Sequence, residues 1–427
     1  MRVLWVCNIM LPVIAQALGE EYSVREGWLS GILGRLLEEK NTAAELELGI
    51  CFPWQSEQAD DTQYLELGSR KVVCYGFRED LTAPENYDPR LEERFARILA
   101  EFQPDLVHIF GTEFGHAYAC AKVWNRPERT LLGIQGLCSS VAENYYADLP
   151  DAVVNSVTLR DLLRKDSIRQ QQEKFRMRAE REEMTIRLAG HITGRTEFDK
   201  KVSLQKNPKA RYHFMNETMR SGFYEGSWSL ENCNRQEIFI SQGDYPLKGF
   251  HYLLEAMPII LKEAPQARIK VAGNSILGTG GVKSMLKLPA YGKYLRSLIR
   301  KYGLEGRIQV LGRMQEEQMK QEYLSCHVFV CPSAVENSPN SVAEAQLLGV
   351  PVAASQAGGI PSVVEHEKSG LLFEKGKADQ LAEAILRIMK EDDFARKLSA
   401  SEQKLAAKKY DGDANYSRLL EIYEDIL

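Results

Sequence analysis

The sequence predicts two α/β domains, each built on a doubly wound parallel sheet. Three observations support this prediction. The chain has 427 residues, and a single hydrophobic core stops growing near about 250–300 residues. Short apolar runs alternate with stretches of helical spacing, and this alternation occurs twice. The apolar runs are continuous and β-rich, as expected for strands that a parallel sheet buries on both faces.

The first series of elements begins at the N-terminus. We expect strands at 3–7, 46–52, 71–77, 106–110 and 130–134, and helices at 27–40 and 91–102. A long loop is expected between the first strand and the first helix. These elements would form the first Rossmann-like domain.

A long charged helix is expected at about 156–188, with apolar positions that would form one packed stripe. These positions are Leu159, Leu162, Leu163, Ile168, Phe175, Met184 and Ile186. The alternative is a basic face that lies on a membrane surface, because Arg160, Arg164, Lys165 and Arg169 cluster near its start. The sequence leaves both interpretations open.

The second series follows a loop-rich stretch. Its strands are expected at 237–241, 267–273, 307–312, 327–331 and 350–355, and its helices at 249–262, 291–302, 315–324, 341–348 and 378–391. The predicted domains are therefore 1–188 and 189–410. A last helix, 411–427, completes the chain.

Composition restricts the function. The formal net charge of -5 gives no general attraction to nucleic acid. The N-terminus lacks the apolar length of a signal peptide, and no apolar run approaches the roughly 18–20 residues of a membrane span. The eight cysteines form no CxxC pair, so we expect reduced thiols and a cytoplasmic protein.

Candidate binding residues follow the predicted strands, because open α/β sheets bind ligands beyond the carboxyl ends of their strands. Gly27 opens the first helix, where free N–H groups attract anions. His116 lies in a turn after strand 106–110 and could reach a cleft or remain on the surface. Lys248 follows the first strand of the second domain, at a helix start, where a lysine suits a diphosphate.

The stretch ENSPNSVAE, residues 336–344, follows strand 327–331. Pro339 and the asparagines should delay the helix until about Ser341. Glu336 would then lie in the loop and Glu344 one turn inside the helix. Free N–H groups at 338–342, around Asn340 and Ser341, would lie between the two carboxylates. This arrangement suits sugar hydroxyls and a phosphate.

The chain resembles the retaining glycosyltransferases of family 4, which have the GT-B fold. Glu336 and Glu344 match the E-x7-E motif of that family. The run PSAVENSPNSVAEAQLLGVPVAASQAGGIPSVVEHEKSGLLF (332–373) is similar nearly throughout, as are DYPLKG, KVAGN and VLGRM. The N-terminal half resembles the family only in architecture and in the REGWLSG, GTEFGH and IQGL turns.

The resemblance implies a role for each matched residue. Glu344 would hold the ribose hydroxyls and Glu336 the hydroxyls of the donor sugar. Lys248 would bind the diphosphate, with Gly27 opposite it. His116 would contact the donor sugar near its reacting carbon. The two domains would face a central cleft, and helix 411–427 would cross back to the first domain.

Two positions depart from the family pattern. The arginine that commonly precedes the lysine is missing, since this stretch reads Gln242, Gly243 and Asp244. Arg195, at a strand end in GRTEFD, could replace it as a phosphate ligand. Pro339 stands where the family often has a glycine within the E-x7-E motif.

The expected reaction needs neither a metal nor another cofactor, because Lys248 and helix N–H groups would stabilise the leaving diphosphate. A DxD sequence, which metal-dependent glycosyltransferases use, occurs only at 411–413 and is interpreted as a helix start. The expected donor is a UDP- or GDP-linked sugar. The acceptor could be a sugar, a lipid-linked sugar or a protein, with peripheral contact at the inner face of the membrane.

Three rival functions keep the fold. A nucleotide-sugar epimerase would use the same donor site. A phosphorylase would need a lysine that carries pyridoxal phosphate, and no such lysine can be identified in the sequence. A non-catalytic binding subunit would explain the missing arginine, but the presence of Glu336, Glu344, Lys248 and His116 argues against it. The main prediction is therefore a transferase, with polysaccharide or glycoconjugate synthesis as its setting.

Overall fold

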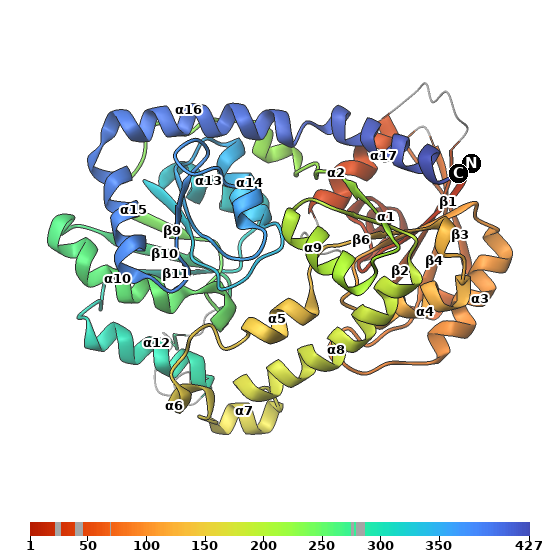
Figure 1. The fold of residues 1–427 in the computed structure, drawn as a ribbon, viewed down its shortest axis with the longest axis horizontal. Coiled ribbons are helices and arrows are strands. Elements are labelled where there is room, and N and C mark those ends of the chain that lie inside the picture. Colours follow the sequence, from red (N-terminus) through yellow and green to blue (C-terminus); the bar gives the residue numbers. More distant parts are fainter. Residues whose placement is uncertain (22–26, 39–45, 69, 275–276, 279–286) are drawn as a thin grey trace. The chain divides into compact units, whose positions relative to one another are not determined.

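The computed structural model describes residues 1–427 apart from 22–26, 39–45, 69, 275–276 and 279–286. The chain forms two compact units (Figure 1). Unit 1 consists of Met1–Ser139, Phe175–Arg220 and Tyr410–Leu427. Unit 2 consists of Ser140–Lys174 and Ser221–Lys409.

This division differs from the predicted boundary after residue 188. Residues 189–220 belong to unit 1, because β7 (His191–Gly194) pairs with β6 (Thr130–Gly133) and β8 (Arg211–Phe214) pairs with β7. Residues 140–174 belong instead to unit 2. The chain therefore leaves unit 1 twice and returns to it twice.

Unit 1 contains an eight-stranded sheet in the order β3-β4-β2-β1-β5-β6-β7-β8. β3 pairs antiparallel with β4, and the other pairings of this sheet are parallel. The remaining strands are β1 (Arg2–Val6), β2 (Glu47–Pro53), β3 (Thr62–Leu67), β4 (Arg70–Phe77) and β5 (Leu106–Phe110). The predicted strands of the first series are confirmed, and β3 is an additional edge strand that the sequence analysis did not identify.

The helices of unit 1 pack on this sheet. They are α1 (Pro12–Leu18), α2 (Gly27–Glu38), α3 (Arg90–Phe102), α4 (Gly115–Trp124), α9 (Glu197–Lys206) and α17 (Gly412–Ile426), with short 3-10 turns η1 (Glu57–Asp60) and η2 (Pro127–Arg129). α1 occupies part of the stretch expected to be a loop. Buried aromatic side chains of the strands and of α3, such as Trp5, Tyr75, Phe95 and Phe102, fill the core.

α17 returns to the start of the chain (Figure 1). Trp5 Nε1 donates a hydrogen bond of 2.8 Å to Tyr423 Oη, and both side chains are fully buried. Without α17, the buried indole N–H would have lost this hydrogen-bond acceptor, which costs stability. The last helix is thus an integral part of unit 1.

The predicted helix 156–188 is two helices. α7 (Leu159–Arg164) ends where Lys165 adopts a left-handed conformation with φ of 51°, and α8 (Ile168–Leu188) begins three residues later. Ile168 and Ile186 are buried as predicted. The prediction of a packed stripe is wrong for Leu159, Leu162 and Leu163 of α7 and for Met184 of α8, because all four side chains are exposed.

Unit 2 contains a six-stranded parallel sheet in the order β11-β10-β9-β12-β13-β14. The strands are β9 (Glu237–Ile240), β10 (Arg268–Ala272), β11 (Ile308–Gly312), β12 (Val328–Cys331), β13 (Val352–Ser355) and β14 (Leu371–Phe373). Five of them were predicted. The chain begins in the middle of the sheet at β9, extends to one edge, and resumes at β12 on the other side of β9.

The helices of unit 2 are α6 (Asp151–Val154), α7, α10 (Phe250–Glu263), α12 (Ala290–Lys301), α13 (Glu316–Ser325), α14 (Asn340–Leu347), α15 (Ala378–Lys390) and α16 (Asp392–Lys409), with 3-10 turns η3 (Ser221–Tyr224), η4 (Pro246–Lys248) and η5 (Ile360–Ser362). α5 (Cys138–Asn144) and α8 run across the boundary between the two units. Phe239, Tyr323 and Phe329 meet edge to face in the core. Within the described part of the chain, no helix has both the length and the apolar character that crossing a membrane requires.

Candidate functional site

The order of strands in unit 2 places a topological switch point between β9 and β12, which pair directly. Successive connections leave the sheet on opposite sides at such a point, so the loops after the two strands diverge and leave a crevice for a ligand. Lys248 follows β9, in the 3-10 turn η4. Glu336 follows β12, in the loop before α14. Two of the predicted residues, Lys248 and Glu336, therefore lie just after the strands that flank the switch point.

Lys248 and Glu336 form an ion pair at the switch point. Lys248 Nζ donates to Glu336 Oε1 at 2.6 Å, and Ser333 Oγ donates to the same oxygen at 2.8 Å. Burial would lower the pKa of Lys248, but the Glu336 carboxylate and the neighbouring Tyr245 together raise it above its usual range. The lysine therefore stays charged at neutral pH, with its ammonium held by a carboxylate.

Two glycines allow the backbones around this pair to approach closely. Gly249 has φ of 67°, and a Cβ there would clash with the carbonyl oxygen of Pro332. Gly358 has φ of 56°, and a Cβ there would clash with the carbonyl oxygen of Glu336. The N–H of Gly359 donates to that same carbonyl at 2.8 Å. The loop that carries Glu336 is thus held by the turn after β13.

α14 begins at Asn340, one residue earlier than predicted. Pro339 precedes it and has no side-chain oxygen to cap the helix, and its carbonyl accepts the N–H groups of Val342 and Ala343. The N–H groups of Asn340 and Ser341 precede the first intrahelical bond, which is the arrangement that binds anions. The sequence analysis expected free N–H groups at 338–342. Within the helix, only the N–H groups of its first two residues, Asn340 and Ser341, can be such donors.

Glu344 lies one turn inside α14 and is buried. Tyr323 Oη lies 3.4 Å from its Oε2 and donates at 3.0 Å to the carbonyl of Ser341. The tyrosine thus fixes both the first turn of α14 and the carboxylate. Sequence analysis did not identify Tyr323, which belongs to the preceding helix α13 and carried no local signal.

A second polar chain joins the ends of β9, β10 and β11. Asn274 Nδ2 donates to Asp244 Oδ2 at 2.6 Å, and Arg313 Nε donates to Asn274 Oδ1 at 2.8 Å. Asp244 occupies the stretch before Lys248 in which the sequence lacks an arginine. The exposed Arg313 is thus a cation tied to that stretch through Asn274, and sequence analysis did not select it.

His116 lies in the first turn of α4 in unit 1 and is 1% exposed. Its Nδ1 lies 2.6 Å from Glu79 Oε2, and Glu79 Oε1 accepts the N–H of Gly115 at 2.8 Å. Burial would raise the pKa of Glu79, but the adjacent His116 and the backbone N–H groups lower it below its usual range. The ionised carboxylate therefore fixes the imidazole. Sequence analysis missed Glu79, although a carboxylate two residues after a predicted strand was a usable signal.

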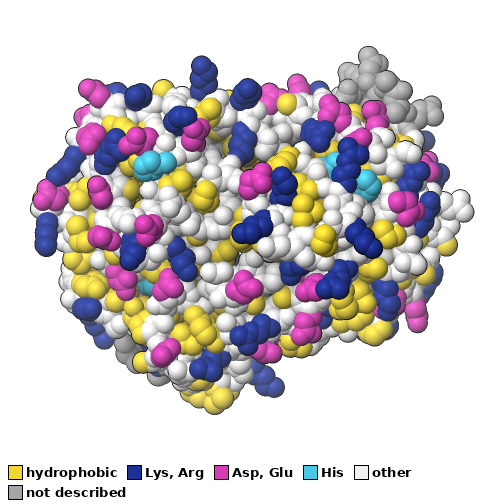
Figure 2. Space-filling model, viewed as in Figure 1, with side chains coloured by type: hydrophobic (Ala, Val, Ile, Leu, Met, Phe, Trp, Pro, Cys, Tyr) yellow, Lys and Arg dark blue, Asp and Glu magenta, His cyan; other side chains and the backbone are white. Residues whose placement is uncertain are grey.

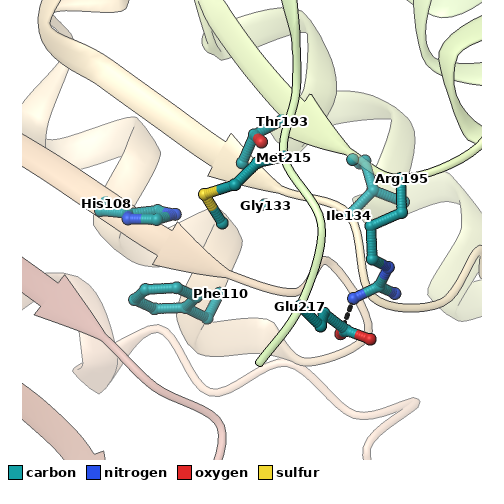
Figure 3. A pocket seen from close by; sticks show the side chains of 9 residues that line it. His108, Phe110, Gly133, Ile134, Thr193, Arg195, Met215 and Glu217 are labelled. Carbon is teal, nitrogen blue, oxygen red and sulfur yellow. Dashed lines mark hydrogen bonds and ion pairs between the residues drawn. The ribbon is translucent and has the colours of Figure 1, made fainter. Parts of the chain in front are cut away.

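Arg195 lies after β7, and it too belongs to unit 1. Its guanidinium pairs with Glu217 (Figure 3). It also donates to the carbonyl of Gln135 at 3.3 Å. The Arg195 side chain is 9% exposed and that of Glu217 is 2% exposed. The structure therefore gives this arginine a buried carboxylate as its partner. Gly27 is the first residue of α2.

Arg195 also lines a small cavity of about 20 Å³ in unit 1, which is room for one water molecule. His108 and Thr193 line it as well (Figure 3). Trp5 Nε1 donates to Tyr423 Oη, so the tyrosine hydroxyl donates to His108 Nδ1, which is 2.8 Å away. The ring proton of His108 then lies on Nε2. Burial lowers the pKa of His108 to about 3, so the ring is neutral.

The structure thus brings Lys248 and Glu336 together in unit 2, near the helix that carries Asn340, Ser341 and Glu344. His116, Arg195 and Gly27 belong to unit 1. Two of these three are engaged with buried carboxylates that sequence analysis did not select. The roles assigned to all of these residues stay predictions.

Comparisons with known proteins show a family match for part of the chain and a shared fold for the whole of it. Residues 228–405 match the family described as "Glycosyl transferases group 1". A D-inositol 3-phosphate glycosyltransferase of Corynebacterium urealyticum is 29% identical over 180 residues, which is 42% of this chain and 41% of that protein. The chain spans less than half the length of the first curated relatives that it matches.

Solved structures resemble the whole chain. Sucrose-phosphate synthase from Thermosynechococcus elongatus has a TM-score of 0.68 at 16% identity and covers 100% of this chain and 99% of its own. Anabaena HepE, solved in complex with UDP-glucose, has a TM-score of 0.64 at 16% identity and covers 100% of both chains. The fold is GT-B, with two Rossmann-like domains.

Proposed function

We propose that the chain is a retaining glycosyltransferase of family 4. It transfers a sugar from a UDP- or GDP-linked donor to a hydroxyl acceptor, without a metal. The donor site lies in unit 2, at the switch point between β9 and β12. Gly27 and His116, in unit 1, keep the roles that the family resemblance implies, and Arg195 is the phosphate ligand that would replace the missing arginine.

One observation carries this proposal. The ion pair of Lys248 and Glu336 lies at the switch point of a parallel sheet, inside the residues that match the glycosyltransferase family. A charged lysine and the N–H groups at the start of α14 favour a diphosphate. The buried Glu344 and the paired Glu336 supply acceptors for hydroxyl groups. Together these groups suit a nucleotide-sugar better than any smaller ligand.

The chemistry follows from the charges. The bond between the anomeric carbon and the diphosphate oxygen breaks, and negative charge develops on that oxygen. Lys248 and the N–H groups of α14 stabilise this charge. The acceptor oxygen forms the new bond on the same face of the sugar, and its proton passes to the leaving diphosphate. Glu336 holds the sugar as it gains positive charge.

The acceptor and the setting are proposed from the family resemblance. A cell-surface polysaccharide or another glycoconjugate is the product we favour, with a sugar, a lipid-linked sugar or a protein as acceptor. The HepE structure holds UDP-glucose, which supports testing UDP-glucose first. We place the reaction in the cytoplasm.

A panel of donors tests the proposal. Thermal unfolding is followed with UDP-, GDP- and ADP-sugars, and release of the free diphosphate is then measured with a mixture of sugar and lipid-linked acceptors in EDTA. We expect one donor to stabilise the protein and to release its diphosphate. Binding without release under any acceptor would favour a non-catalytic binding subunit, and a changed sugar still attached to the nucleotide would identify an epimerase.

A further inference from the structure

Helix α7 of unit 2 carries an unusual apolar face. Leu159, Leu162 and Leu163 are spaced as i, i+3 and i+4, so they lie on one side of the helix. Their exposed fractions are 68%, 65% and 76%, and that of the preceding Val157 is 56%. We call these four side chains the α7 face. An apolar stripe of this spacing normally faces a core, but here it faces outward.

Buried polar contacts hold α7 in this orientation. Asp161, on the opposite side of the helix, is 1% exposed. It forms a capping box with Thr158 and also accepts the N–H of Ala290, at the start of α12, at 3.0 Å. Arg160 donates to Asp161 and to Asp166 at 3.0 and 2.8 Å. The polar side of α7 is thus fixed against α12, and the leucines have no inward orientation to adopt.

Positive charge surrounds the α7 face. Arg164, Lys165 and Arg169 are exposed, and their side chains take part in none of the hydrogen bonds or ion pairs found among the described residues. α12, whose first residue Ala290 donates its N–H to Asp161, has the sequence AYGKYLRSLIRK and contains no acidic residue. Toward the lower edge of the view, where Figure 1 places α7, Figure 2 shows hydrophobic side chains together with Lys and Arg, and Asp and Glu side chains among them. Arg160 adds no positive charge to this surface, because it is paired with two carboxylates, those of Asp161 and Asp166.

We propose that the α7 face docks the protein on the surface of an anionic lipid bilayer. The leucines and Val157 enter the boundary between headgroups and acyl chains, and Arg164, Lys165 and Arg169 bind the lipid phosphates. A basic rim around an exposed apolar stripe is the pattern that such a surface attracts. Burying the face against a second copy of the chain would instead bring two sets of like charges together.

This docking surface is separate from the donor site. The four side chains of the α7 face are exposed, and none of them takes part in the contacts of Lys248, Glu336 or Glu344 described above. Loss of the leucines should therefore leave nucleotide binding unchanged. The inference also stands apart from the proposed transfer reaction, because it depends only on the surface of α7.

Vesicle flotation tests the proposal. The full chain is mixed with vesicles of phosphatidylcholine, with or without about one-third phosphatidylglycerol. Leu162→Gln/Leu163→Gln removes apolar side chains, and Arg164→Gln/Arg169→Gln removes charge. The matched control is Lys404→Gln/Leu405→Gln, which replaces an exposed lysine and an exposed leucine on α16. Thermal unfolding and UDP calorimetry verify that each variant is folded.

The protein should float with the anionic vesicles and not with the neutral ones. The leucine variant should lower this partitioning about tenfold or more. The arginine variant should lower it as well and should reduce its dependence on salt. The control should bind like the parent protein.

Two kinds of result, one from flotation and one from sedimentation, would overturn the proposal. The first is a protein that does not bind anionic vesicles, or a control that loses binding as strongly as the leucine variant. The second is sedimentation of the parent as a dimer that the leucine variant dissociates, since the face would then be an interface between copies. Neither result would affect the assignment of the donor site, which diphosphate release tests separately.

Discussion

Replacing Glu336 by glutamine should tighten the binding of free UDP, whereas replacing Lys248 by methionine should weaken it. The reason is that Glu336 already occupies the ammonium of Lys248, at 2.6 Å. A diphosphate must share this ammonium or displace the carboxylate. Glutamine keeps the size of the side chain but removes its charge, so the lysine becomes available.

The magnitudes follow from the burial of the pair. The two side chains are 21% and 16% exposed, which places the interaction between an exposed ion pair and a buried charged hydrogen bond. Loss of this ion pair should make the binding free energy of UDP more favourable by about 1 kcal/mol, so UDP should bind roughly fivefold more tightly. Lys248→Met removes a charge-assisted bond of about 1.5–3 kcal/mol, so UDP should bind about ten- to a hundredfold more weakly.

Calorimetry with UDP in EDTA measures both effects. Lys270→Met is the matched control, because Lys270 is 17% exposed and pairs with Glu237 and Glu322, away from the carboxyl end of the sheet. It should leave the affinity for UDP unchanged. Glu336→Gln should also lower the transfer rate, since the glutamate would contact the sugar. If Glu336→Gln weakens UDP binding as much as Lys248→Met in a folded protein, the reasoning fails.

Four further outcomes are expected. Glu344→Gln should weaken UDP binding about ten- to a hundredfold by calorimetry, because a ribose contact is lost; unchanged affinity would remove Glu344 from the site. Turnover should survive EDTA, and strict loss that a divalent ion restores would contradict this. Gly358→Ala should cost about 2–3 kcal/mol of unfolding free energy in urea, since its φ is 56° and its Cβ would meet a backbone oxygen; a neutral effect would contradict it. Burial lowers the pKa of His108 from its usual value of 6.5 to about 3, so the unfolded chain binds more protons than the folded one between these values. The unfolding free energy should therefore fall by up to about 1.4 kcal/mol per pH unit as the pH drops from 6.5 toward 3, and His108→Phe should reduce this slope.

The sequence was sufficient for five of the six strands of the unit 2 sheet and for the positions of Lys248 and Glu336 at its switch point. A parallel strand buried on both faces is a continuous apolar run, so β9 and β12 were visible, and a residue just after such a run must lie at the ligand edge of the sheet. Lys248 and Glu336 were found on this ground. β3, by contrast, is a partly exposed edge strand, TQYLEL, whose polar composition gave no clear signal.

The remaining errors concern contacts between distant segments. Glu79 follows β4 and is 37 residues from His116 in the sequence, and no local pattern reports that their loops meet. The leucines of α7 have the spacing of a core stripe, and only the contact of Asp161 with the start of α12 turns them outward. The division of the chain was misjudged for the same reason, because β7 and β8 join unit 1 through pairing with β6.

Because α17 completes the core of unit 1, it affects the order in which the two units can fold during synthesis. Trp5 and its partner Tyr423 are separated by 418 positions. At about 5–20 residues per second, roughly 20–80 s pass between the synthesis of the two. Every residue of unit 2 is made within that interval. The half of the protein that begins first should therefore be the second to reach its native state, and until then a chaperone could recognise its unfinished core.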